Sequence, residues 1–121
     1  MNSEEIKRHI MSFMYAERLK SALIIAGDLL DVLADLDEGE RSGGLKVLAS
    51  FVRGLGGEMR IAANVMGSED WKGLPAQLNL MEGYARLGQM EAARQELSRS
   101  LSLATTLSSR AMNSLQTLGL I

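Results

Sequence analysis

Side chains whose chemistry could support catalysis or metal binding are few and scattered in this 121-residue chain. His9 is the single histidine, and the chain contains no cysteine. Histidine-based catalytic dyads and zinc sites need more such groups than this, and thiolate chemistry and disulfides are excluded. Glu5 lies four residues before His9, whereas di-iron helical bundles use a Glu-x-x-His spacing in duplicate. We therefore expect no catalytic residue, no cofactor and no metal ion.

Two segments partly match loop motifs that bind cations or phosphates, but each lacks residues that its motif requires. A calcium loop that starts at Asp35 would place its invariant glycine on Glu40 and its bidentate glutamate on Lys46. Residues 39–46 contain glycines and a lysine, but they lack the Gly-Lys-Ser/Thr order of a phosphate-binding loop. Neither segment therefore predicts a ligand site.

Acidic side chains gather near the end of the first forty residues, which carry nine acids and four bases. Asp28, Asp31 and Asp35 share one helix face, and Glu38 continues the cluster. A solvated polar face is the ordinary interpretation of such a run. Carboxylates near a helix C-terminus oppose the helix dipole, however, and local rules are often broken at functional surfaces. These four residues are our candidate acidic docking patch for a basic partner.

The bulk composition describes one globular domain. Hydrophobic residues form 46% and charged residues 23% of the chain, which argues against disorder. The net charge of −2 offers no concentrated basic surface for nucleic acid or an anionic membrane. The longest apolar stretch, residues 22–26, is far below the ~20 residues that span a bilayer, and residues 1–10 do not resemble a signal peptide. We expect a single soluble, cytoplasmic domain over residues 1–121.

The elements that must position any site are helices. Apolar residues recur at three- and four-residue steps in four segments, which predicts helices at about 3–36, 42–66, 74–87 and 90–118. Asn2 and Glu5 form a capping box before the first helix.

Glycines mark most of the predicted helix ends. Gly67, Gly88 and Gly119 are expected as C-caps, while residues 37–44 are expected to form a loop and residues 68–73 a turn containing Trp71. Three more glycines fall inside the second helix, where they indicate either a kink or the close approach of another helix: Gly54, Gly56 and Gly57.

Short connections predict antiparallel neighbours, so the expected fold is an all-α antiparallel bundle of about four helices, built from two helical hairpins. The helix at 74–87 is much shorter than the others. The start of the first helix or the end of the last should therefore protrude, and a protruding apolar face needs a partner.

Residues 74–107 resemble a single tetratricopeptide repeat. The resemblance lies in an aromatic residue, a turn glycine, a small residue and two apolar residues at matching positions, namely Tyr84, Gly88, Ala93, Leu97 and Leu101. The segment departs from the repeat at Ser100, where a small apolar residue is usual, and at Thr105, which replaces the terminal proline. The resemblance implies a peptide- or protein-binding scaffold, as in adaptors and small secretion chaperones.

The last predicted helix has an unusual polar surface. Between residues 98 and 117 its only charges are Arg99 and Arg110, and interface cores are likewise depleted in Lys and Glu. The helix is either covered on two sides by its own bundle or in contact with a partner. The candidate partner-binding residues, which include one from the first helix, are Ile24, Leu97, Leu101, Leu107, Arg110 and Leu115.

Three functions remain open at this point. The preferred one is a non-enzymatic protein-interaction module, a small adaptor or chaperone-like bundle that binds a protein partner or forms a homodimer. A second is a ligand-binding or enzymatic bundle whose polar pocket would draw on Asp28, Asp31, Glu58, Tyr84 or Arg86. A third is a structural or regulatory subunit of a larger complex.

Overall fold

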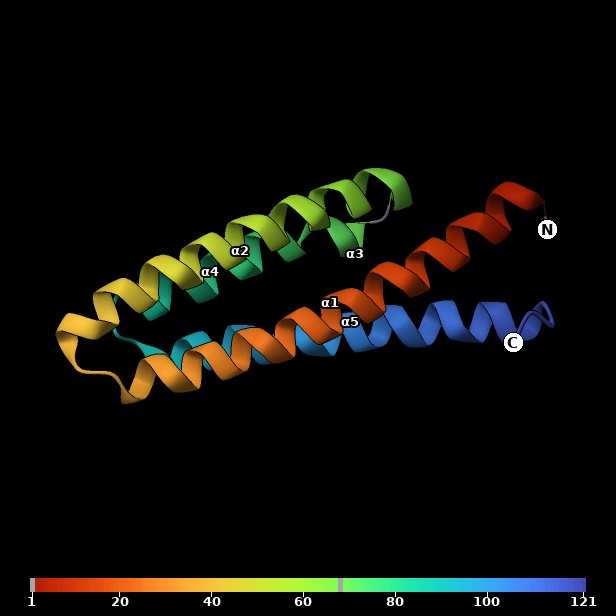
Figure 1. Cartoon of the computed structure of the whole chain (residues 1–121). Helices are drawn as coiled ribbons and strands as arrows, with labels where there is room; N and C mark the ends of the chain where they lie inside the picture. The colour runs from red at the N-terminus through yellow and green to blue at the C-terminus, as the bar shows by residue number, and fades with distance from the viewer. Residues whose placement is uncertain (1, 68) are drawn as a thin grey trace.

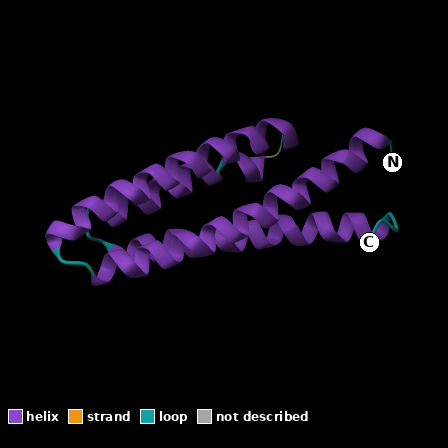
Figure 2. Cartoon of the chain, in the orientation of Figure 1, coloured by secondary structure: helices purple, strands orange, loops and turns teal. Residues whose placement is uncertain are grey.

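The computed structural model of the chain describes residues 2–67 and 69–121 (Figure 1). These residues form helices and connecting turns, without a strand (Figure 2). The helices are α1 (Ser3–Asp35), α2 (Glu38–Met66), α3 (Glu69–Lys72), α4 (Leu74–Arg86) and α5 (Met90–Thr117). The predicted all-α antiparallel bundle is confirmed, with four main helices and the short α3 inserted where a turn was expected.

The four main helices form two layers, one of α1 with α5 and the other of α2 with α4 (Figure 1). The most extensive contact in the chain joins α1 to α5, its first and last helices. Small buried residues permit this close packing, and they include Ala26 on α1 and Ala104 on α5. Between the layers, α1 contacts α2 and α4 contacts α5, which are the two hairpins that the sequence predicts.

The start of α2 differs from the prediction. A loop was expected over residues 37–44, but α2 begins at Glu38 and only Leu36 and Asp37 separate it from α1. Asp37 Oδ1 accepts a hydrogen bond of 2.8 Å from the backbone N–H of Glu40, which caps the new helix. The glycines at 39, 43 and 44 lie within the helix, so composition was a poor guide to the loop here.

Gly44 has a packing role in this turn. A Cβ added at Gly44 would collide with the side chain of Leu33, which is itself buried in the core. The glycine therefore lets the first turns of α2 lie close against the end of α1, which a larger residue would prevent.

The capping carboxylate of Asp37 leads to a pH prediction. The hydrogen bond from the Glu40 backbone holds the pKa of Asp37 below its ordinary value of 3.8. Because the pKa is lower in the folded state, the cap stabilises the fold above about pH 3.8, and this contribution is lost as the pH falls through the folded pKa. Asp37→Ala should lower the thermal midpoint at neutral pH, and the gap to wild type should narrow in acid.

Asp37→Asn is the matched control for that experiment. Asparagine caps helices as well as aspartate does but does not titrate. Its thermal midpoint should stay near that of the wild type at neutral pH. An alanine variant that is as stable as the asparagine variant would contradict the capping role.

The glycines inside α2 do not interrupt it. The helix runs without a break from Glu38 to Met66, and a Cβ added at Gly54 or Gly57 would meet no atom within 4 Å. The alternative of a close approach by another helix of the same chain is therefore wrong at these two positions. Nothing in the described chain explains why they are glycine.

Alanine at these two positions should stabilise the protein. Gly54→Ala and Gly57→Ala are each expected to raise the free energy of unfolding by about 0.5–1 kcal/mol, because alanine loses less backbone entropy in a helix. Gly44→Ala is the contrasting control and should destabilise, since its Cβ collides with Leu33. Urea unfolding followed by circular dichroism measures all three, and a destabilised Gly54→Ala protein would refute the prediction.

The predicted C-caps are confirmed. Gly67, Gly88 and Gly119 all have positive φ, at 65°, 77° and 73°. At the end of α5 the N–H of Leu120 donates to the carbonyl of Leu115 at 3.0 Å, and the N–H of Gly119 donates to the carbonyl of Gln116 at 2.9 Å. These two bonds form a Schellman cap at the glycine that the sequence predicts as a C-cap.

Candidate functional site

The polar residues proposed for an enzymatic pocket do not come together. Asp31 pairs with Arg94 of α5 at 3.2 Å, Glu58 pairs with Arg18, and Arg86 pairs with Glu82 of its own helix at 3.0 Å. Tyr84 lines an open hollow with Arg86 and Leu80 but with none of the carboxylates. Asp28 makes no ion pair within the described chain.

His9 lies at the open end of the bundle. It lines a shallow hollow of about 220 Å³ together with Trp71 and Arg110. Within residues 2–67 and 69–121, no three His, Asp or Glu side chains are grouped so that they could hold a metal ion.

This open end is formed by the protruding ends of α1 and α5. Both extend beyond the region that α2 and α4 cover, so the bundle is uneven as the sequence predicts (Figure 1). Trp71 of α3 is 1% exposed and packs edge-on against Tyr15 of α1, with 6.4 Å between ring centroids. Arg110 of α5 pairs with Asp70 of α3 at 2.9 Å. The short helix α3 therefore closes the bundle where the protruding ends begin.

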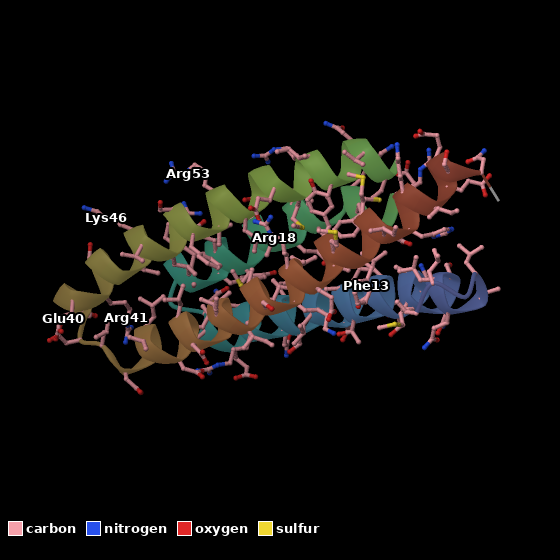
Figure 3. The ribbon with its side chains drawn as sticks, turned by 45° about the vertical axis from the view of Figure 1, so that its right-hand side comes forward. Phe13, Arg18, Glu40, Arg41, Lys46 and Arg53 are labelled. Carbon is pink, nitrogen blue, oxygen red and sulfur yellow. The ribbon has the colours of Figure 1, made fainter. Side chains whose placement is uncertain are left out.

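The candidate acidic docking patch is solvent-exposed along its whole length. Asp28, Asp31, Asp35 and Glu38 are all exposed. The expected conflict with the helix dipole is offset by Arg41, whose guanidinium donates to the carbonyls of Leu33, Ala34 and Leu36 at 3.1, 3.4 and 2.8 Å. Figure 3 places Arg41 beside Glu40 at the α1–α2 turn. The sequence does not reveal this contact, because Arg41 lies in the segment that its glycines predict to be a loop.

Most of the candidate partner-binding residues on α5 are covered by the chain itself. Leu107 and Leu115 are buried, at 6% and 4% exposed, and Leu97 and Leu101 are partly buried against the core. A Cβ added at Gly27 of α1 would lie 3.4 Å from Leu97 Cδ2, so Leu97 packs over this glycine. The bundle therefore covers the apolar side of α5, whereas uncharged polar residues on its other side remain exposed, among them Ser98, Ser102, Thr105, Thr106 and Ser109.

Buried polar groups on α5 complete that contact with α1. The hydroxyl of Ser108 donates to Glu17 of α1 at 2.7 Å, and Lys20 pairs with the same carboxylate at 2.9 Å. The hydrogen bond from Lys20, followed by that from Ser108, lowers the pKa of Glu17. The carboxylate of Glu17 therefore links Lys20 of its own helix with Ser108 of α5.

Ile24 is different from the other candidates, because 57% of its side chain is exposed. It belongs to a larger set of exposed apolar residues on the solvent side of α1. The set also contains Ile10, Met14, Ile25 and Val32, and α2 adds Val47, Ile61 and Val65. We call these eight residues the outer apolar surface.

The sequence carries a signal for the outer apolar surface that its interpretation missed. Ile25 and Val32 stand close to core positions in the sequence of α1, and hydropathy alone cannot tell which side of a helix meets its neighbours. The core row of α1 in fact runs through Leu19, Leu23 and Leu30, about a third of a turn or more away. Figure 3 shows Arg18 between α1 and α2, where its ion pair with Glu58 joins the two helices.

Comparison with known proteins finds no matching family model, no matching curated protein and no matching solved structure. None of the described helices contains a stretch that is long and apolar enough to cross a bilayer. The geometry of the chain therefore carries the functional argument alone.

Proposed function

We propose that this chain is a non-enzymatic protein-interaction module that binds another polypeptide through the outer apolar surface of α1 and α2. The observation that carries the proposal is the exposure of this surface. Met14, Ile24 and Val32 are 58%, 57% and 57% exposed along α1, and Val47 and Ile61 are 59% and 55% exposed on α2.

Several features support a helical partner rather than a small ligand. Five hollows in the described surface are open and have volumes of about 190–370 Å³, whereas the exposed apolar residues extend along two long helices. Gly54 and Gly57 lie on the same side of α2 as Ile61 and leave free space above the backbone. A helix from another chain can approach closely over such small residues, as helices do in packed bundles.

The resemblance of residues 74–107 to a tetratricopeptide repeat adds support of a weaker kind. Gly88 adopts the left-handed conformation at the turn and Ala93 is fully buried where α4 meets α5, as a repeat requires. The adaptor or chaperone-like role that such repeats imply is part of the same proposal.

Paired charge variants test this function. Val47→Lys with Ile61→Lys on α2, and Ile25→Lys with Val32→Lys on α1, should leave helix content and cooperative unfolding intact, because every site is at least half exposed. Each pair should weaken association about tenfold or more, since charge is depleted from interface cores. The readouts are sedimentation velocity of the purified chain and co-purification from cells of its source with wild type and variants in parallel.

Lys46 and Arg53, which point outward from α2 (Figure 3), provide the control. Their replacement by glutamine changes surface charge without touching the apolar residues, and it should leave association unchanged. Two results together would overturn the proposed function. The wild-type chain would be monomeric, and no protein would co-purify with it that fails to co-purify with the lysine variants.

A further inference from the structure

Seven residues of α1 form a second heptad row on its solvent side, distinct from its core row. The steps between them alternate between four and three residues, and all seven are exposed: Met14, Arg18, Ser21, Ile25, Asp28, Val32 and Asp35. A 4-3 alternation is the pattern with which one helix packs along another in a coiled coil. The fold uses the opposite row, through Leu19, Leu23 and Leu30. The apolar members of the outer row remain exposed, and Arg18 is the one member that forms an ion pair within the described chain, with Glu58 of α2.

The geometry points to a second copy of this chain as the occupant, with the two α1 helices antiparallel about a two-fold axis at Leu23. This inference rests on the proposed function and names its partner. A two-fold interface brings the same surface of both copies together, so that each contact occurs twice. In this register the outer row matches itself at every position from Met14 to Val32.

Three contacts repeat across the axis. Met14 meets Val32 of the other copy, so apolar side chains meet. Arg18 meets Asp28, so opposite charges meet. Ser21 meets Ile25, so a small residue faces a large one, and Ile24 (57% exposed) adds apolar surface beside the axis.

Other arrangements of the same two helices fit worse. In a parallel pair each Arg18 would face Arg18 and each Asp28 would face Asp28, and like charges across an interface are costly. Moving the antiparallel pair by one heptad in one direction sets Val32 against Lys7, and in the other direction sets Ile25 against Asp28. The self-complementary register is therefore favoured by its charges as well as by its apolar contacts.

The two charged residues that meet between the copies, Arg18 and Asp28, are both able to form this ion pair. Asp28 has no ion-pair partner in the described chain, so it is free to accept one. Arg18 already pairs with Glu58 of α2, but its side chain is 65% exposed and a guanidinium has five donors, so it can bind a second carboxylate.

Acidic residues beside the seam do not oppose the pairing. Glu17 and Asp31 flank the outer row on the side of α5, and two antiparallel copies bring them near each other. Each is already neutralised within its own chain, Glu17 by Lys20 at 2.9 Å and Asp31 by Arg94 at 3.2 Å.

A charge exchange on the full chain tests the partner and the register. Arg18→Asp and Asp28→Arg each place like charges opposite one another and should raise the dimer dissociation constant about tenfold, as measured by sedimentation velocity. The double variant exchanges the charges and should restore the wild-type constant to within about threefold. Glu58→Gln is the control for the lost intrachain pair and should leave the constant near that of the wild type.

Cysteine cross-linking gives a second readout, because the chain contains no native cysteine. A mixture of Met14→Cys and Val32→Cys proteins should form a mixed disulfide, because these positions meet across the axis. Neither protein alone should cross-link to itself, since two copies of either position lie about 27 Å apart at 1.5 Å per residue.

The outcomes separate this inference from the proposed function. Restoration by the charge exchange together with the mixed disulfide supports the antiparallel dimer. A dimer that is insensitive to both charge reversals, or a Val32→Cys protein that cross-links to itself, overturns the inference while the proposed function stands. A monomer that binds a different protein through the outer apolar surface does the same, and a monomer without any partner overturns both.

Discussion

Trp71→Ala should destabilise the protein by about 3–5 kcal/mol, a large share of the ~5–15 kcal/mol that holds a typical domain folded. Trp71 is the largest fully buried side chain of the described residues, at 1% exposed, and it belongs to α3, which packs against α2 and α4. Its removal leaves a cavity and takes away the edge-on contact with Tyr15.

Urea unfolding followed by far-ultraviolet circular dichroism measures this loss, since the variant has no tryptophan left for fluorescence. Trp71→Phe keeps an aromatic ring at the site and should lose clearly less stability than the alanine variant. If the urea midpoint of Trp71→Ala matched that of the wild type, the closing role of α3 would be refuted.

The second large effect contrasts two faces of α1. Leu30→Ala should lower the free energy of unfolding by about 2–5 kcal/mol, because Leu30 is fully buried in the hydrophobic core. Ile24→Ala, on the same helix but with 57% of its side chain exposed, should change the free energy of unfolding by no more than about 0.5 kcal/mol.

The comparison must be made at low protein concentration, where association does not add to stability. The same pair then serves as a check on the outer row. Raising the protein concentration should increase the free energy of unfolding of the wild type. The increase should be smaller for the Ile24→Ala protein. Equal losses for the two variants at low concentration would show that the core face of α1 has been assigned incorrectly.

Local signals in the sequence predicted the helices well. The positive-φ glycines at 67, 88 and 119 end three helices at the expected places, because a C-cap depends on the few residues around it. Asn2 Oδ1 likewise accepts a hydrogen bond of 2.9 Å from the backbone N–H of Glu5, which is one of the two bonds of the predicted capping box.

Features that depend on tertiary contacts were not predictable in the same way. Arg41 binds carbonyls at the end of α1, and Gly44 makes room for Leu33, so a glycine-rich segment expected to be a loop becomes a helix. Periodicity also cannot say which helix each face meets. The burial of Leu107 and Leu115 follows from the long contact between α1 and α5. The sequence of neither helix predicts that contact by itself.

The candidate site was predicted least well for the same reason. Ile24, a candidate partner-binding residue, is exposed beside the outer row, and two members of that row, Asp28 and Asp35, belong to the candidate acidic docking patch. The sequence did not single out the row itself. The 4-3 spacing from Met14 to Val32 was present in the sequence. The spacing alone does not say whether this row is buried or exposed. That becomes clear only from the packing of the four main helices, in which the opposite row of α1 forms the core contacts.

The pairing of the first helix with the last affects how the chain folds as it is synthesised. Domains commonly begin to fold while the ribosome is still adding residues. Here α1 (Ser3–Asp35) is made well before its main partner, α5 (Met90–Thr117). The buried row of α1 therefore lacks its most extensive packing contact until α5 has also been synthesised.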